Sequence, residues 1–309
     1  MTRPFRRRVL YVPGFDPMPP RRYRELYRRE SQQQARISGF DLTMTKTAGD
    51  GWQTQARFPE GEARTQIRIL VWADLVQASM RGGIAATYAQ MVRVAWIYVA
   101  SGALRRLTRL RRGPVLAALY PVAVLLAQAV AAALVAALTG WVVMALTGLG
   151  WLAGIVAAGA AWAVLAAARS LDHRLFAHYL MHDYAFTASL HGAYPPDLEQ
   201  RLAQFTDRLA QALSQDLDEV LVVGHSSGAY LAVSMVADLL RRDQPPGPAL
   251  SLLTLGHVVP MASFLPRAQR LRADLAFLSE HPGLFWLDVS APGDPCSFAL
   301  CDPVAVTGV

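Results

Sequence analysis

The stretch VLVVGHSSGAYLA occupies residues 220–232, and the interpretation of the whole chain starts from it. Four apolar residues run into the pattern Gly224-x-Ser226-x-Gly228, and small residues follow in a helix-like run. A buried strand that turns sharply into a helix needs glycine at these two places, because side chains there would keep the strand and the helix apart. The stretch therefore predicts a strand, a tight turn at Ser226 and a helix.

Ser226 is the candidate nucleophile of this turn. A turn of this kind holds the serine in a strained backbone conformation and exposes its hydroxyl. An exposed and activated serine hydroxyl attacks carbonyl carbons and forms a covalent intermediate. A purely structural turn is the alternative, and the strand before Ser226 and the helix after it favour the nucleophile.

The rest of the chain, outside its middle third, alternates between strand and helix patterns. Such alternation predicts the α/β class, with a mostly parallel sheet and helices on both of its faces. We expect strands at 8–12, 40–47, 52–58, 67–72, 219–223, 250–255 and 284–289, with a hairpin turn at 49–51, and helices at 19–37, 195–215, 227–242 and 263–280.

The middle of the chain contains a long apolar block without a charged residue, from Val115 to Ala168. A single helix of that length would reach about 80 Å, whereas the hydrocarbon core of a bilayer is about 30 Å thick. We therefore expect a transmembrane hairpin with spans at 115–138 and 148–168, in which small residues such as Gly154 and Gly159 allow close helix packing. A buried pair of core helices is the alternative.

A third apolar stretch, residues 84–104, is interrupted by Arg93. An arginine near the middle of a bilayer is costly, so we expect this stretch to lie in the membrane interface rather than to span it.

The net charge of +7 comes from arginine almost entirely, because Lys46 is the only lysine. Arginines flank both ends of the apolar block, and the positive-inside rule then places residues 1–110 and 170–309 in the cytoplasm. The arginine excess is typical of a GC-rich genome and indicates a bacterial source. Together with the apolar hairpin, it predicts a multi-pass protein of a bacterial inner membrane. The basic flanks favour a lipid bilayer as partner, and no nucleic-acid-binding motif is present.

The sequence predicts neither a metal site nor a cofactor. The two cysteines, Cys296 and Cys301, match no metal spacing and are expected to be ordinary thiols. His178 and His182 stand four residues apart, as two metal ligands on one helix would, but the seven histidines of the chain are too few for a membrane di-iron site. We expect these two histidines to serve interfacial packing or contact with lipid headgroups.

The turn at Ser226, the alternation and two later motifs resemble the α/β-hydrolase superfamily, and its lipase-like and esterase-like members in particular. The later motifs are Leu252-Leu253-Thr254-Leu255-Gly256 and Gly293-Asp294-Pro295. The resemblance covers residues 1–74 and 193–309. Residues 75–192 do not share it, and they stand as a helical insertion where many lipases carry a lid.

The resemblance implies a catalytic serine, acid and histidine in that chain order. Ser226 corresponds to the nucleophile and Asp294 to the acid, with Asp288 and Asp302 as alternatives; a plain turn is the other interpretation of Asp294. The oxyanion would be held by the backbone N–H groups of Ser227 and Phe15, with Pro13-Gly14 in place of the usual His-Gly.

The catalytic histidine is not identified, because no histidine follows Asp294. Three explanations stay open: the C-terminal part of the fold is missing from this chain, His257 or His281 takes the role, or the protein has no hydrolase activity. His225 lies next to Ser226 in sequence and cannot turn back to its hydroxyl.

These observations predict a membrane-anchored serine hydrolase that cleaves ester bonds of a lipidic or acyl substrate through an acyl-enzyme on Ser226. A non-catalytic membrane protein on the same scaffold and an acyltransferase are the alternatives.

Overall fold

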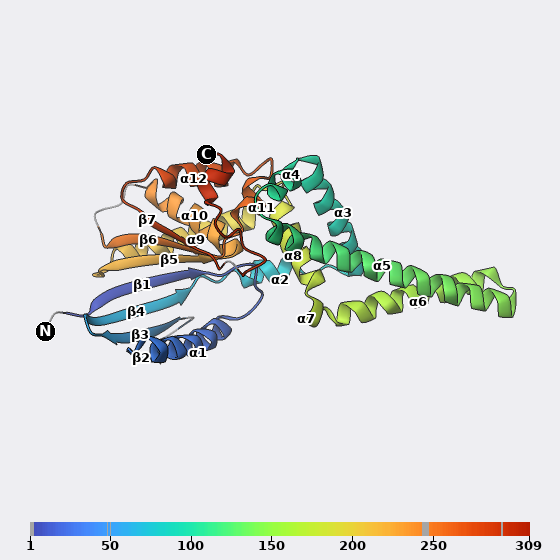
Figure 1. Ribbon diagram of the computed structural model, residues 1–309, viewed down its shortest axis with the longest axis horizontal. Helices are drawn as coiled ribbons and strands as arrows, with labels where there is room; N and C mark the ends of the chain where they lie inside the picture. The colour runs from blue at the N-terminus through green and yellow to red at the C-terminus, as the bar shows by residue number, and fades with distance from the viewer. Residues whose placement is uncertain (1–2, 48, 50, 243–246, 292) are drawn as a thin grey trace.

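The computed structural model describes residues 3–47, 49, 51–242, 247–291 and 293–309. The two parts on either side of the middle third form a sheet with flanking helices, and the middle third is helical (Figure 1). The first part contains β1 (Phe5–Val12), α1 (Pro20–Ser38), β2 (Asp41–Lys46), β3 (Gly51–Phe58), β4 (Gly61–Ile69) and α2 (Ala73–Ser79). The middle contains α3 (Ile84–Ala100), α4 (Ala103–Thr108), α5 (Arg112–Thr147), α6 (Gly150–Ser170), α7 (Asp172–Leu175) and α8 (Ala177–Ala188). The last part contains α9 (Pro196–Leu213), β5 (Glu219–His225), α10 (Ser227–Leu240), β6 (Ala249–Leu255), α11 (Val259–Ser263), α12 (Gln269–Ser279), β7 (Phe285–Val289) and α13 (Pro303–Thr307).

The seven strands form one mixed sheet in the order β2-β3-β4-β1-β5-β6-β7. The five strands from β4 to β7 run parallel, and β2 and β3 join them as antiparallel neighbours. The α/β class and the mostly parallel sheet are thus confirmed. The turn predicted at 49–51 lies partly outside the described residues. Strand β4 begins at Gly61, earlier than predicted, because it pairs along the whole length of β3.

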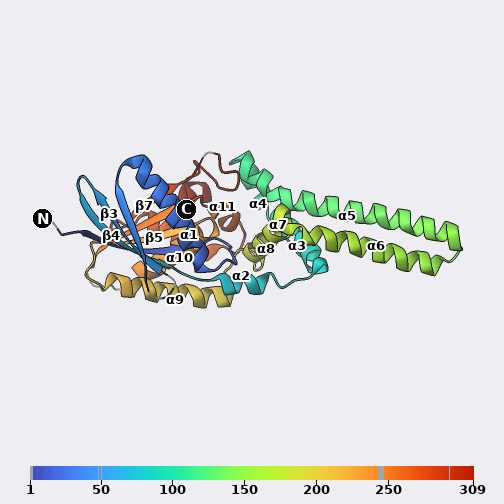
Figure 2. The same ribbon diagram turned by 90° about the horizontal axis from the view of Figure 1, so that it is seen from below.

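Helices lie on both faces of the sheet (Figure 2). One face is covered by α9, α10 and α12, which contribute most of the main core, and α1 packs on the opposite face against β2 and β3. Every residue of α10 from Ser227 to Ala237 is buried, because this helix lies between the sheet and its neighbours. The central pair is β1 and β5, whose register places Val12 opposite Gly224. The turn after β5 and the loop after β1 therefore lie side by side.

Helices α5 and α6 form an antiparallel hairpin that projects from the sheet (Figures 1 and 2). Both are long and apolar enough to cross a membrane. The start of α5 is packed into the protein, with Pro114, Pro121 and Leu125 buried. Residues 126–147 extend beyond this packed part over about 33 Å, close to the thickness of a bilayer's hydrocarbon core. Large apolar side chains along this part of α5 and along α6 are exposed, among them Leu134, Leu138, Trp141, Leu146, Trp151 and Ile155.

The first helix of the hairpin does not end at residue 138 as predicted. It continues to Thr147, and the chain reverses at Gly148, whose φ of 66° is favourable for glycine. Gly140 serves close packing instead of the turn, because a Cβ built on it would lie 3.3 Å from Cβ of Ala157. The predicted packing glycines, Gly154 and Gly159, have no described neighbour within 4 Å of such a Cβ.

Residues 84–104 do not form one continuous helix, and the interfacial position expected for them stays a prediction. They divide into α3 and α4 at Gly102, whose φ is 72°. Helix α3 buries Met91, Val94 and Ile97, and it packs along α8. The helix predicted at 263–280 is likewise shorter, and α12 begins only at Gln269 after the short α11 and the segment around Pro266.

Candidate functional site

The turn between β5 and α10 has the geometry that the glycine pattern predicts. Ser226 adopts φ 55° and ψ −121°, a positive φ that is uncommon for a residue with a side chain. A Cβ on Gly224 would lie 2.6 Å from the carbonyl oxygen of Gly228, and one on Gly228 would lie 2.2 Å from that of Val12. Glycine is therefore required at both positions, and the strand, turn and helix form a sharp junction with Ser226 at its tip.

The loop after β1 lies directly against this junction. A Cβ on Gly14 would lie 3.1 Å from Cβ and 3.5 Å from Oγ of Ser226. Among the described residues, no acceptor is hydrogen-bonded to the N–H groups of Phe15 or Ser227, the two donors predicted for an oxyanion. The Phe15 carbonyl oxygen accepts a hydrogen bond from the Tyr179 hydroxyl, so α8 holds this loop in place.

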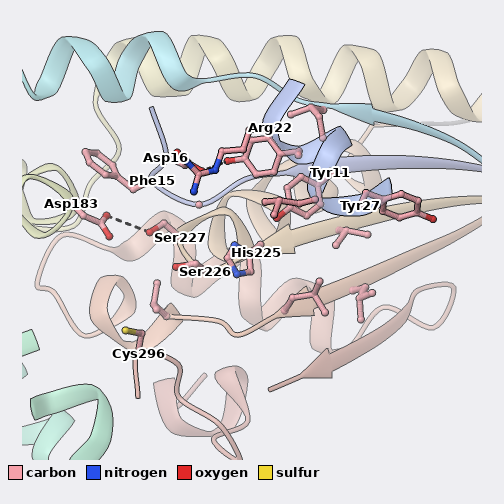
Figure 3. Close-up of a pocket in the computed structure, with 18 of the residues that line it drawn as sticks. Tyr11, Phe15, Asp16, Arg22, Tyr27, Asp183, His225, Ser226, Ser227 and Cys296 are labelled. Atoms are coloured by element: carbon pink, nitrogen blue, oxygen red, sulfur yellow. Dashed lines mark hydrogen bonds between the residues drawn. The ribbon is translucent and has the colours of Figure 1, made fainter. Parts of the chain in front are cut away.

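Ser226 opens onto a cavity of about 810 Å³ (Figure 3). Its floor is a face of the parallel strands, formed by apolar side chains of β1, β5 and β6. Its walls come from α1, from the first turns of α5, and from α8, so the helical insertion helps to build the site. The floor residues are Val9, Leu221, Val223, Leu253 and Leu255, and the walls include Tyr23, Leu26, Pro114, Ala117, Tyr179 and Tyr184.

Asp294, the predicted acid, lies in the loop after β7, at the same edge of the sheet as Ser226. Its Oδ1 accepts the N–H of Cys296 at 2.9 Å, and its Oδ2 lies 3.4 Å from a Cβ built on Gly256 at the end of β6. The Asp294 charge also acts on His225, where it opposes the lowering of the histidine pKa by burial. Asp294 is therefore close to the turn, but among the described residues no histidine is hydrogen-bonded to Asp294 or to Ser226.

His257 is close to Asp288 but does not face the cavity. Its ring is completely buried, and its Nε2 lies 2.9 Å from the carbonyl oxygen of Cys301 and 3.7 Å from Asp288 Oδ2. Its Nδ1 accepts the N–H of Val259. Both ring nitrogens are occupied by structural contacts, so His257 is not placed to act as the base for Ser226.

Asp302, Asp288 and His281 serve local structure rather than the site at Ser226. Asp302 caps α13 by accepting the N–H groups of residues 304 and 305. Asp288 accepts the Thr254 hydroxyl at 2.6 Å. His281 precedes β7, and because β7 and β5 belong to the same parallel set, it lies at the sheet edge opposite to Ser226.

His225 lines the cavity beside Ser226 (Figure 3). No hydrogen bond joins its ring to the Ser226 hydroxyl in the described part of the chain. The surrounding protein lowers the pKa of His225 although the ring is open to the cavity, which favours a neutral imidazole at pH 7.

Asp183 is a residue of this site that the sequence patterns did not indicate. It lies in α8, lines the cavity, and accepts a hydrogen bond from the Ser227 hydroxyl at 3.4 Å (Figure 3). Burial raises the pKa of its carboxyl to about 7, and the Ser227 hydroxyl lowers it only in part. One signal could have found it: Asp183 is the only carboxylate between Asp172 and Asp197.

The opposite wall of the cavity carries polar groups from the loop after β1 and from α1. Asp16 accepts the Tyr23 hydroxyl at 2.6 Å and the N–H of Met18 at 2.9 Å, so its carboxylate is fixed in position. Arg22 is exposed and lies beside Asp16 at the cavity (Figure 3).

The predicted free thiols are observed, with Cys296 exposed on the cavity and Cys301 buried. His178 and His182 are buried in α8, where burial lowers the pKa of both. Within the described residues, no three histidine, cysteine or carboxylate side chains gather as metal ligands would.

The chain matches no protein-family model, no curated protein and no solved structure at a significant level.

Proposed function

We propose that the protein is a serine hydrolase of the α/β-hydrolase type that cleaves ester bonds of acyl or lipidic substrates. The observation that carries this proposal is the strained turn at Ser226, which opens onto a cavity beside two N–H groups without an acceptor among the described residues, those of Phe15 and Ser227. A serine at such a turn, next to free backbone donors, is the arrangement that acyl transfer requires.

The reaction follows from these positions. The Ser226 Oγ attacks the ester carbonyl carbon, and the negative charge that develops on the carbonyl oxygen is stabilised by the two N–H groups. The alcohol then leaves with the proton that Ser226 lost, and an acyl-enzyme remains. Water attacks the acyl carbon in the second half, releases the acid and returns a proton to Ser226. Asp294 lies at the same edge of the sheet and adds negative charge near the turn.

The lining of the cavity supports an acyl substrate. Beyond Ser226 the floor consists of aliphatic side chains such as Val223, Leu253 and Leu255. Burying a methylene group against such a surface stabilises a bound acyl chain by about 0.8 kcal/mol. The first turns of α5 form a wall of the same cavity, so the site adjoins the root of the apolar hairpin.

We further propose that α5 and α6 anchor the protein in a bacterial inner membrane, with the sheet on the cytoplasmic side. The exposed apolar part of each helix fits the bilayer thickness, and arginines gather at the root of the hairpin. Some of these arginines also hold the protein together: Arg106 covers the ring of Phe264 at 3.9 Å, and Arg111 donates to the carbonyl oxygen of Ala299.

A non-catalytic membrane protein on this scaffold is the second candidate. One observation favours it: among the described residues, no histidine is hydrogen-bonded to Ser226. The two candidates differ in the reactivity of the Ser226 hydroxyl, because a scaffold protein has no need of an activated serine.

The test is labelling of the detergent-solubilised protein with a fluorophosphonate, which reacts with activated serines. We expect the wild type to be labelled and Ser226→Ala to be silent. Ser290→Ala is the matched control, since it changes a serine at the same sheet edge and should label normally. Labelling that persists in Ser226→Ala would overturn the assignment of the nucleophile, and a folded wild type that is not labelled would support the scaffold.

A further inference from the structure

The cavity at Ser226 extends to both sides of the nucleophile. On one side it reaches the root of the hairpin, where Pro114 and Ala117 of α5 line it. On the other side it runs between the sheet and α1 toward Tyr27, so that Ser226 lies between the two parts (Figure 3). We call the second part the sheet arm; its floor is formed by Val9, Leu221, Val223 and Leu253, and its wall by Leu26 and Tyr27.

The floor of the sheet arm is a continuous apolar surface over three parallel strands. Side chains two residues apart on a strand point to the same face. The register places Val9 of β1 beside Leu221 of β5, and Val223 of β5 beside Leu253 of β6. Because all four line the cavity, this face of the sheet is aliphatic from β1 to β6.

The described helices leave this floor without a packed cover. The opposite face of the same strands carries α9, α10 and α12, whereas α1 on this face packs against β2 and β3. Leu26 and Tyr27 of α1 line the cavity but are 41% and 37% exposed. Apolar side chains that face each other across an open space favour an apolar molecule between them, since it removes their surface from water.

The charged groups of the sheet arm lie at its two ends. Asp16 and Arg22 lie at the end near Ser226 (Figure 3). Arg7 lies at the far end, where it forms an ion pair with Glu219, and Glu30 of α1 is exposed there. The shape and charge of the arm therefore suit a long apolar chain whose reactive end is at Ser226.

The length of the arm follows from strand geometry. Arg7 lies opposite Glu219, which precedes His225 by six residues, so the arm is about 20 Å long at about 3.3 Å per residue. An extended hydrocarbon chain, with single bonds of about 1.5 Å, advances about 1.3 Å per carbon, so about 14–16 carbons would fill the arm.

We propose that the sheet arm holds the acyl chain of a long-chain ester, with the ester carbonyl at Ser226 and the methyl end toward Arg7. The alcohol part of the ester then lies on the hairpin side. This inference rests on the proposed hydrolase function, and it adds the length and the direction of the substrate's acyl chain.

The chemistry of acyl transfer favours this direction. The acyl group stays on Ser226 Oγ after the alcohol has left, so it needs a site of its own beside the turn. The sheet arm leads away from the hairpin, whereas the other side of the cavity adjoins the first turns of α5, which gives the alcohol a separate exit (Figure 1). The ion pair of Arg7 and Glu219 limits the chain length, because methylenes beyond it gain no apolar contact.

The experiment compares kcat/KM of the detergent-solubilised full chain for nitrophenyl esters of butanoate, octanoate and tetradecanoate. Each fully buried methylene improves binding by about threefold to fourfold, so kcat/KM for tetradecanoate should exceed that for butanoate by about 100-fold or more. A wild type that cleaves butanoate and tetradecanoate equally well would overturn the inference.

Two variants obstruct the arm at different depths. Leu221→Trp places a large ring on the middle of the floor, and we expect the ratio of kcat/KM for tetradecanoate to that for butanoate to fall about tenfold or more. Leu253 lies opposite Val223 and so is nearer to Ser226 along the strands. Leu253→Trp should therefore also lower the ratio for octanoate to butanoate, and by more than Leu221→Trp does.

Leu287→Trp is the matched control. It makes the same change on the neighbouring strand β7, opposite Leu253, at a side chain that is exposed and does not line the cavity. We expect it to keep the wild-type ratios, and a melting curve confirms that each variant is folded. Wild-type ratios in both Leu221→Trp and Leu253→Trp would overturn the inference, and so would an equal loss in Leu287→Trp.

A second copy of this chain is the other occupant that an apolar sheet face could take. A wild-type dimer in detergent that becomes monomeric in Leu221→Trp would overturn the acyl chain in favour of that copy. The proposed function fails in a different way, if Ser226→Ala still reacts with the fluorophosphonate or if the wild type neither reacts with it nor cleaves any of the esters. A labelled Ser226 without chain-length preference removes only the inference about the sheet arm.

Discussion

Asp183→Asn should make the protein more stable, and more so at high pH than at low pH. Desolvation raises the pKa of this largely enclosed carboxyl from 3.8 to about 7 in the folded protein, and the Ser227 hydroxyl offsets only part of that effect. An asparagine of nearly the same shape can still accept the Ser227 hydroxyl bond. It carries no charge, so it avoids the cost of burying one.

The sign and size of the effect follow from proton linkage. Between pH 4 and pH 7 the folded state holds a proton on Asp183 that the unfolded chain has lost, so wild-type stability decreases as the pH rises through this window. Each pH unit is equivalent to about 1.4 kcal/mol, and the interval from pH 5 to pH 7 therefore changes the free energy of unfolding by about 3 kcal/mol. The advantage of Asp183→Asn over the wild type should grow by this amount between pH 5 and pH 8.

Melting temperatures in detergent at pH 5 and pH 8 provide the assay. At about 2–4 °C per kcal/mol, the gap between variant and wild type should widen by about 6–12 °C from the lower to the higher pH. Other titrating groups are shared by both proteins and cancel in this difference. Equal gaps at the two pH values would show that Asp183 titrates as an ordinary carboxyl, and the inference from its burial would then be wrong.

Three further predictions concern other parts of the molecule. Gly228→Ala should lower soluble yield and melting temperature sharply, because the new methyl group would collide with the Val12 carbonyl oxygen at the end of β1. The control Gly154→Ala, which lies in open space on α6, should change neither quantity. Arg106→Ala should lower the melting temperature, because it removes a cation–π contact of about 1–2 kcal/mol and loosens α4 from α11. The control variant Arg105→Ala should have no such effect. Burial lowers the pKa of His178 and His182, so the stability that they contribute is complete above about pH 6.5 and is lost as the pH falls below it. Replacing both with leucine should therefore flatten the acid side of a curve of melting temperature against pH. An unchanged curve would contradict this prediction.

Most strands and helices could be predicted because their signals are local. The apolar run of β5, the glycines of the turn and the small residues of α10 are contiguous in sequence, and their steric demands concern neighbours only. The hairpin was predicted for a similar reason, since its length and lack of charge are properties of one segment. Its turn was predicted too early, because Gly140 proved to be a packing residue, and sequence alone does not distinguish a glycine that turns the chain from one that allows close contact.

The candidate site was only half predictable. The sharp turn at Ser226 and its contact with the Pro13-Gly14 loop depend on nearby glycines, so the sequence alone was enough to predict this backbone geometry. Whether a carboxylate or an imidazole lies beside Ser226 depends on how α8 and the loops after β6 and β7 pack against the junction. Asp183 and Ser227 are 44 residues apart, and no periodicity links them. That Asp183 reaches Ser227 and that His257 is buried away from the cavity follow from long-range packing rather than from local backbone sterics, so these positions became visible only in the folded structure.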